Sequence, residues 1–178
     1  KNYSDKGKMN VWPQGEYFSI TDTFEANRVT YRDLQIPKRG ALLDWGCYDG
    51  RNTNILTERF SPRRVIGIDM FKNSIKRAKR EYPDLEFYCM DGCDYDKLEE
   101  LGQLGVIFAM NNLLQGLKNG NIKEYDFQHI INGVFRELLI EDGVIVLSDG
   151  NDLCYQNRNG VWMSNEFKER DLVRRLLT

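Results

Sequence analysis

The chain has few of the residues from which metal sites and membrane spans are made. Its 178 residues include one histidine, and its four cysteines show no CxxC pairing. Zinc sites are usually built from four such ligands at close spacing, so no metal site is expected. Apolar runs reach only about five residues, whereas about 20 are needed to cross a bilayer, and no signal-peptide pattern is present. We therefore expect a cytoplasmic protein with reduced thiols that does not act at a membrane.

The sequence also lacks an excess of charge of either sign. It has 25 basic and 27 acidic residues, which give a formal net charge of −2. This balance produces no general attraction to nucleic acid or to an anionic membrane surface. A chain of this length can form one ordinary domain with a core of its own. We expect that domain over residues 24–178, preceded at residues 1–23 by a polar segment with scattered aromatic residues that forms a mobile arm or lid.

What the sequence does contain is an alternation of short apolar runs with amphipathic segments. Strands are expected at residues 41–45, 64–69, 85–90, 104–110 and 143–149, and helices at 24–35, 51–60, 72–82, 95–101, 122–140 and 165–177. The expected strands are nearly continuous apolar runs, which is typical of parallel sheets with helices on both faces. Alternating strands and helices predict right-handed crossovers, and therefore an α/β fold around a parallel sheet.

Polar and mostly acidic residues stand at the ends of all five expected strands. They read Asp44-Trp45-Gly46, Asp69-Met70, Asp91-Gly92, Asn111-Asn112 and Ser148-Asp149. In doubly wound sheets, ligands bind beyond the carboxyl ends of the strands, near the point where the strand order reverses. The sequence therefore predicts a ligand site at this edge of the sheet.

The stretch ALLDWGCYDGRNT, residues 41–53, has the pattern of a nucleotide-binding turn. A short apolar strand is followed by a turn that contains Gly46 and Gly50, and then by a polar helix start. Small residues at such a turn let backbone amides approach a ligand at the helix N-terminus. A second strand, VIGIDM, ends in Asp69, about twenty residues after Gly50, where a carboxylate usually binds the hydroxyls of a ribose.

The charge of this turn distinguishes between nucleotide ligands. A dinucleotide-binding turn would read GxGxxG, whereas here Asp44 precedes the turn and Asp49 lies inside it. These carboxylates would repel a pyrophosphate and would attract a ligand that carries an ammonium and a sulfonium group. S-adenosylmethionine is such a ligand. A nicotinamide-dependent oxidoreductase is correspondingly disfavoured.

Four segments of the chain resemble motifs of the Rossmann-like, class I S-adenosylmethionine-dependent methyltransferases. They are LDWGCYDGRNT, VIGIDMFKNSIKRAK, LEFYCMDG and RELLIEDGVIVLSD, and the resemblance covers about residues 40–150. It implies a three-layer α/β/α sandwich with a mostly parallel Rossmann-like sheet, a methyltransferase activity and S-adenosylmethionine as cofactor. The fourth strand is followed by AMNNLLQG rather than an NPPY-like sequence. A nucleic-acid acceptor is therefore not indicated, and a small-molecule acceptor is expected.

The resemblance also implies which residues contact the cofactor. In this sequence they are Asp44, Gly46, Cys47, Tyr48, Gly50, Asp69, Met70, Asp91, Gly92 and Asn111. Asp44 and the two glycines of the turn would surround the methionine moiety, and Asp69 would accept hydrogen bonds from the ribose. Met70 would pack on the adenine, and Asp91 would accept a hydrogen bond from its amino group. Asn111 is expected near the amino-acid end or the transferred methyl group.

No catalytic residue follows from the motifs with the same clarity. Asp149, at the end of the fifth strand, is a candidate general base for a hydroxyl acceptor, and Asn111 is a second candidate. His129 is the single histidine, but its helical neighbours Tyr125 and Arg136 place it on a polar, solvent-facing side. The basic residues of the 72–82 helix lie opposite its apolar stripe and are expected to form a solvated face.

Two departures from the family pattern leave alternatives open. Tyr48 stands where the family usually has a glycine, and a positive φ there would cost about 1 kcal/mol or more. The turn then has another shape, or the ring covers the ligand. The terminal antiparallel strand pair is not evident, so either the sequence is truncated, or the domain lacks the pair, or a following domain supplies it. An uncovered sheet edge would allow self-association. A non-catalytic S-adenosylmethionine-binding domain, or a module of a larger protein, is therefore the alternative function.

Overall fold

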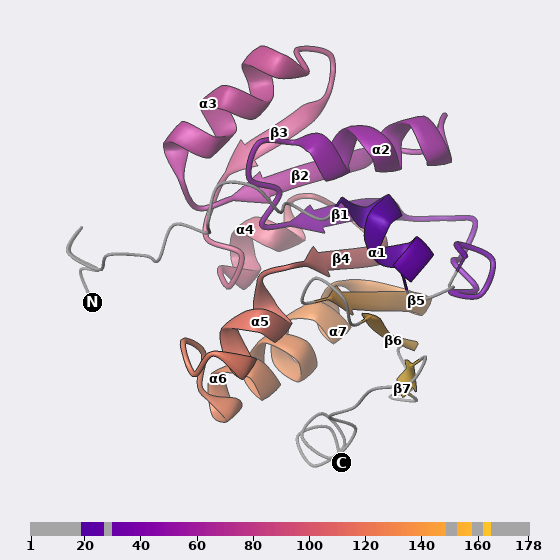
Figure 1. The fold of residues 1–178 in the computed structure, drawn as a ribbon, viewed down its shortest axis with the longest axis vertical. Coiled ribbons are helices and arrows are strands. Elements are labelled where there is room, and N and C mark those ends of the chain that lie inside the picture. Colours follow the sequence, from indigo (N-terminus) through magenta and orange to yellow (C-terminus); the bar gives the residue numbers. More distant parts are fainter. Residues whose placement is uncertain (1–18, 27–29, 149–152, 158–161, 165–178) are drawn as a thin grey trace.

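Seven strands form one mixed sheet in the computed structural model, which describes residues 19–26, 30–148, 153–157 and 162–164 (Figure 1). The strands are β1 (Ala41–Trp45), β2 (Val65–Asp69), β3 (Glu86–Cys89), β4 (Leu104–Met110), β5 (Leu139–Ser148), β6 (Leu153–Asn157) and β7 (Trp162–Ser164). The helices are α1 (Ile20–Ala26), α2 (Arg51–Phe60), α3 (Lys72–Glu81), α4 (Tyr95–Glu99), α5 (Leu113–Lys118), α6 (Glu124–His129), the π-helix η1 (Ile130–Phe135) and α7 (Arg136–Leu138).

The sheet has the order β3-β2-β1-β4-β5-β6-β7, with β1 in its middle part. The first five strands are parallel, and Leu43 of β1 is paired with Ile66 of β2 on one side and with Ile107 of β4 on the other. The chain moves outward from β1 to β3 and then returns to the other side of β1. The strand order therefore reverses between β1 and β4, and the carboxyl ends of these two strands define the switch point.

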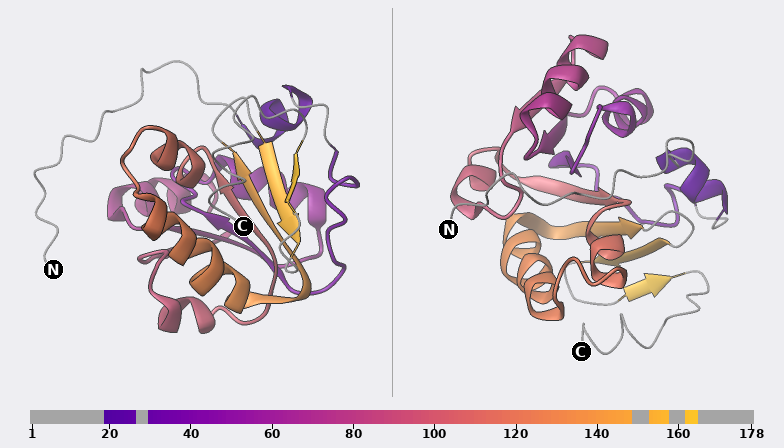
Figure 2. Two further views of the ribbon diagram at one scale, coloured as in Figure 1. Left: turned by 90° about the horizontal axis from the view of Figure 1, so that it is seen from below. Right: turned by 60° about the vertical axis from the view of Figure 1, so that its left-hand side comes forward.

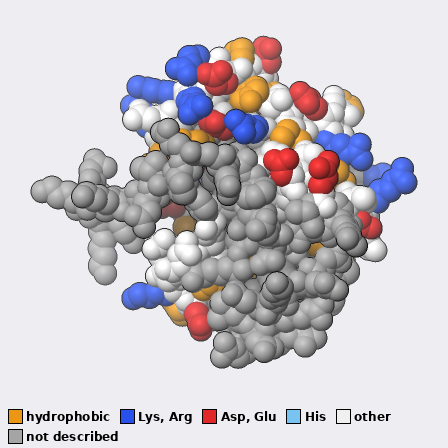
Figure 3. Space-filling view, in the orientation of Figure 1, with side chains coloured by type: hydrophobic (Ala, Val, Ile, Leu, Met, Phe, Trp, Pro, Cys, Tyr) orange, Lys and Arg blue, Asp and Glu red, His pale blue; other side chains and the backbone are white. Residues whose placement is uncertain are grey.

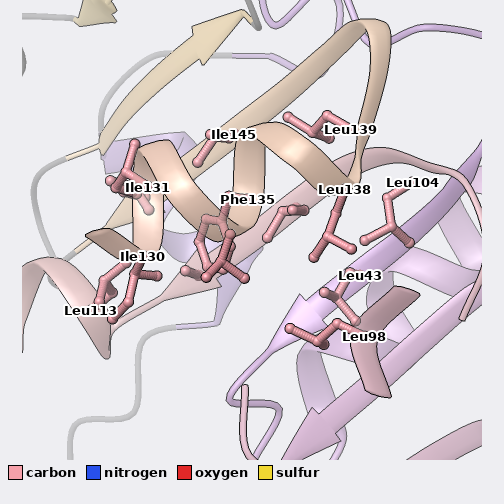
Figure 4. Packing of buried hydrophobic residues seen from close by; sticks show 14 of the residues in the cluster. Leu43, Leu98, Leu104, Leu113, Ile130, Ile131, Phe135, Leu138, Leu139 and Ile145 are labelled. Atoms are coloured by element: carbon pink, nitrogen blue, oxygen red, sulfur yellow. The ribbon is translucent and has the colours of Figure 1, made fainter. Parts of the chain in front are cut away.

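Helices cover both faces of the sheet, which gives the three-layer α/β/α sandwich (Figure 2). Because side chains alternate along a strand, Leu42 faces the cluster formed with α1 and α2, whereas Leu43 faces the cluster formed with α4 to α7. Figure 4 shows part of the second cluster, in which Leu43, Phe135 and Ile145 are fully buried. Two apolar layers thus fix the parallel strands and their shared carboxyl edge.

The central part of the chain follows the sequence-based expectations closely. Strands β1 and β4 and helix α2 have the expected bounds, and β2, β3, α3 and α4 differ from them by no more than two residues at either end. The expected helix over 122–140 is α6, η1 and α7 in succession, and β5 begins at Leu139 rather than at Gly143. Helix α5 was not expected. None of the helices in the described part of the chain is long and apolar enough to cross a membrane.

The terminal antiparallel strand pair, whose absence was one of the alternatives left open by the sequence, is present in this domain. Strands β6 and β7 are present, and both are antiparallel to their neighbours. In β6, Leu153 and Tyr155 join the cluster under α1 and α2, whereas Cys154 joins the opposite cluster. This alternation is that of a strand buried on both faces, but it covers too few residues to separate a strand from a loop by pattern alone. The helix expected at 165–177 lies outside the described residues.

The first helix begins earlier and ends earlier than expected. Ser19 and Asp22 form a capping box, in which the backbone amide of each residue donates to the side chain of the other. Helix α1 therefore starts at Ile20, and residues 20–23, expected to belong to the arm, are part of it. Its predicted continuation to residue 35 is wrong, because residues 31–35 form a turn and Gln35 has a φ of 49°. Residues 1–18 of the arm lie outside the described residues.

Candidate functional site

The turn after β1 is fixed by hydrogen bonds to the end of β2. The backbone amides of Gly46 and Cys47 both donate to the carbonyl oxygen of Ile68, at 2.9 and 2.8 Å. The Tyr48 amide donates to Oδ2 of Asp69 at 3.1 Å, and the Gly50 amide to the Cys47 carbonyl at 2.9 Å. A pyrophosphate-binding turn directs such amides at the ligand. Here all four are used within the protein, so the turn is not built to bind a pyrophosphate.

Tyr48 has the left-handed backbone conformation that favours glycine. Its φ is 47°, between Gly46 at 76° and Gly50 at 84°. This conformation costs a residue with a Cβ about 1 kcal/mol or more. It also directs the Tyr48 amide at Asp69, and 48% of the residue's surface is exposed. Of the two possibilities left open by the sequence, another shape of the turn is excluded, because Tyr48 keeps the positive φ and the turn tolerates the strain. That the ring covers the ligand stays a prediction.

Asp69 is a nearly buried carboxylate with two backbone donors. Its Oδ1 accepts from the Phe71 amide at 2.8 Å, and its Oδ2 accepts from the Tyr48 amide. Each carboxylate oxygen can accept a second hydrogen bond. Burial raises the pKa of Asp69, and the two amides act in the opposite direction. The side chains beside it, Met70 and Phe71, are exposed apolar groups.

Asp44 is the most deeply buried carboxylate of the site. Its Oδ2 accepts a hydrogen bond of 2.6 Å from Oγ1 of Thr53, in the first turn of α2. Burial raises the pKa of Asp44 to about 7; the Thr53 hydrogen bond lowers it, and the carboxylates of Asp69 and Asp49 raise it further. Asp49 itself forms an ion pair of 3.6 Å with Arg77 of α3. The carboxylates of Asp44, Asp49 and Asp69 thus lie around one turn, and of these Asp49 is paired with an arginine.

Cys47 takes part in the turn only through its backbone. Its side chain is buried against Ile75, Ala78 and Phe87, and burial raises the pKa of its thiol. Gly50 has no room for a side chain, since a Cβ there would lie 2.6 Å from Cζ of Phe87. The packing of the turn against Phe87 of β3 therefore requires a glycine at position 50, and so does its positive φ.

The loop after β3 is linked to the turn through a residue that sequence reasoning did not select. Trp45, the last residue of β1, donates from Nε1 to the carbonyl oxygen of Gly92 at 2.8 Å. Asp91 is exposed, and its Oδ1 accepts from the Cys93 amide at 2.9 Å. The predicted residues Asp91 and Gly92 are thus held beside the turn.

The loop after β4 forms the other wall of the switch point. Asn111 has a φ of 56°, and its amide donates to the Ser148 carbonyl at 3.0 Å. Asn112, which was not among the predicted cofactor contacts, donates from Nδ2 to the Trp45 carbonyl at 2.6 Å and caps α5. A Cβ at Gly46 would lie 2.5 Å from this Nδ2. The candidate general base Asp149 lies outside the described residues.

Two other features are surface features, as the sequence indicated. His129 is exposed on α6. The basic residues of α3 are exposed, and Figure 3 shows Lys and Arg side chains gathered over that region. Apart from Arg77, which is paired with Asp49, they do not reach the candidate site through any contact in the described part of the chain.

Comparison with known proteins gives this geometry a family. A family model described as a methyltransferase domain matches residues 42–131. The chain belongs to this methyltransferase family. The matched region runs from β1 to the π-helix and includes every predicted cofactor residue. The family and the fold inferred from the motifs are confirmed, and S-adenosylmethionine is the cofactor of this class.

Two individual relatives of this methyltransferase domain match it over less than half of its length. A protein named as methyltransferase 235L of Invertebrate iridescent virus 6 is 40% identical over 84 residues, which are 47% of this chain and 32% of that protein. A trans-aconitate 2-methyltransferase of Azoarcus sp. (strain BH72) is 31% identical over 87 residues, 47% of this chain and 33% of that one. The chain thus spans about a third of the length of the curated relatives it matches.

Solved structures show the same fold. PKMT2 of Rickettsia typhi, solved in complex with AdoHcy, superposes with a TM-score of 0.51 at 21% identity, covering 62% of this chain and 20% of that one. At this identity the likeness concerns the fold, and the roles of single residues rest on the geometry above.

The Tyr48→Gly variant should have a higher free energy of unfolding than the Tyr48→Ala variant. Tyr48→Ala loses the ring but keeps the Cβ and therefore the strain, whereas Tyr48→Gly removes the strain. Because glycine loses more backbone entropy on folding, the net difference should be about 0.5–1 kcal/mol. Urea unfolding of the two variants measures it. A glycine variant no more stable than the alanine variant would contradict a strained turn.

The stability of the ligand-free domain should depend on the titration of Asp44. Burial raises the pKa of Asp44 from its ordinary value of 3.8 to about 7 in the folded state, so the folded state binds the proton more tightly. Its contribution to stability is therefore lost as pH rises from about 4 to about 7, by about 4 kcal/mol at most. Asp44→Asn cannot titrate, so its stability relative to the wild type should increase with pH between 4.5 and 8 in urea unfolding. Parallel pH profiles for the two proteins would rule this out.

Proposed function

We propose that this chain is the catalytic domain of an S-adenosylmethionine-dependent methyltransferase that acts on a small-molecule acceptor. The observation that carries the proposal is the charge of the turn after β1. Asp44, Asp49 and Asp69 surround it, and its amides are bonded within the protein. A cationic adenosyl ligand fits such a site, because its ammonium and sulfonium groups offset the buried negative charge.

The ribose and the adenine are assigned to the ends of β2 and β3. Asp69 has acceptor capacity left on both carboxylate oxygens after binding the amides of Tyr48 and Phe71, which suits two adjacent hydroxyls. The exposed apolar side chain of Met70 is placed next to it to pack on the purine. Asp91 is the acceptor for the adenine amino group, at the end of the neighbouring strand.

The methionine moiety is assigned to the switch point. Gly46 and Gly50 let the turn lie close to Asn112 and Phe87, and Asp44 is buried beside it in a hydrogen bond with Thr53. The bound cofactor would supply a methyl group already activated by its sulfonium. The protein then needs mainly to exclude water and to hold an acceptor atom in line with that methyl group. Asn111, at the end of β4, is placed to position the amino-acid end, and Asp149 stays a candidate base for a hydroxyl acceptor.

The acceptor is assigned by class only. The composition has no excess of positive charge that would favour nucleic acid, and a matching relative is named for trans-aconitate. Small carboxylic acids are therefore the first acceptors to test. Methyl transfer from labelled S-adenosylmethionine to trans-aconitate and related acids measures turnover. Ligand binding without transfer to any small molecule would favour the alternative of a non-catalytic binding domain.

Calorimetry should show binding of S-adenosylmethionine and S-adenosylhomocysteine, but not of NAD. Asp69→Ala should weaken S-adenosylhomocysteine about ten- to a hundredfold, because hydrogen bonds to a charged acceptor contribute about 1.5–3 kcal/mol. Asp84→Ala, which removes an exposed carboxylate far along the chain from the turn, is the matched control and should leave the affinity unchanged. Equal affinities for the wild type and Asp69→Ala would refute the assignment of the ribose.

A further inference from the structure

Trp45 makes contacts with two loops at the carboxyl edge of the sheet and with the π-helix η1. Its indole Nε1 donates to the Gly92 carbonyl in the loop after β3, at 2.8 Å. Its own carbonyl accepts from Nδ2 of Asn112 in the loop after β4, at 2.6 Å. Its ring meets that of Phe135 edge to face, with centroids 5.6 Å apart. One residue of the β1 turn thus joins the walls on either side of it.

The backbone at Gly92 and Gly46 is packed closely against the two side chains that make these contacts. A Cβ at Gly92 would clash with the indole ring of Trp45, and a Cβ at Gly46 would meet the side chain of Asn112. The Trp45–Gly92 hydrogen bond thus holds the loop after β3 in close contact with the end of β1. Phe135 is fully buried in the layer of α4 to α7, so the ring that carries the indole N–H is supported from below.

Asp91 precedes Gly92 directly, and the backbone of this loop fixes where its carboxylate stands. The Asp91 Oδ1 accepts from the Cys93 amide, so the carboxylate moves with the loop. We propose that Trp45 is a positioning residue for purine recognition, which holds Asp91 where it selects a 6-amino purine over a 6-oxo purine. The inference rests on the proposed function, since it requires that the site binds an adenosyl ligand.

The chemistry of the two purines explains why position matters. The amino group of adenine donates a hydrogen bond to a carboxylate, whereas the 6-oxo group of hypoxanthine presents an oxygen to it. A site built to pair with one group rejects the other, because a polar group is then left unpaired. This selectivity requires the carboxylate at hydrogen-bond distance and is lost when the loop moves away.

The test compares the affinities for S-adenosylhomocysteine and S-inosylhomocysteine, measured by calorimetry. Trp45→Phe removes the indole N–H but keeps an aromatic ring against Phe135. Because one hydrogen bond contributes about 0.5–1.5 kcal/mol, the preference for S-adenosylhomocysteine should fall about three- to tenfold. Asp91→Ala should abolish the preference. In the double variant the preference should equal that of Asp91→Ala alone, since Trp45 acts through Asp91.

A purely structural role gives a different result. Trp45→Phe would then lower the melting temperature and weaken both ligands equally, and this outcome overturns the inference. So does an Asp91→Ala variant that keeps the preference. If the wild type binds neither ligand, the proposed function fails and the inference fails with it, whereas tight but unselective binding refutes the inference alone. Gly92→Ala, which displaces the indole, provides the same test if Trp45→Phe does not fold.

Discussion

The carbonyl oxygen of Ile68 accepts hydrogen bonds from the amides of Gly46 and Cys47, and the shape of the site depends on this contact. It ties the turn after β1 to the end of β2, so the next amide, that of Tyr48, meets Asp69. The left-handed backbone at Tyr48 follows from the same constraint. The turn is therefore ordered before any ligand arrives, which reduces the entropy that binding would otherwise cost.

The electrostatic character of the site follows from the hydrogen bonds that fix the turn after β1. With the amides used internally, the groups left at the turn are carboxylates, and the deepest of them, Asp44, is buried with a hydroxyl as its partner. A buried carboxylate of this kind is unfavourable in the empty protein, which is why burial raises its pKa. The carboxylates at this turn therefore have a chemical explanation. Burying them is unfavourable in the empty protein, and a cationic ligand would offset that free energy.

The sequence was most informative where the structure is local. The strand, turn and helix from Ala41 to Phe60 are specified by neighbouring residues, so their bounds could be predicted from the sequence. The contacts of Trp45 with Gly92 and Asn112 could not, because they join loops that are brought together only by the sheet. Strand β6 was missed for a related reason, since its pairing with β5 is a tertiary contact and its own pattern is short.

The central position of β1 has a consequence for how such domains diverge. Its neighbours in the sheet, β2 and β4, come from separate parts of the chain, so the two walls of the switch point are built from different segments. Two proteins with the same turn after β1 can therefore present different walls after β4 to whatever lies beside the turn. A change in the loop after β4 that keeps the Asn112 contact with Trp45 would leave the turn intact and alter the surface beside it.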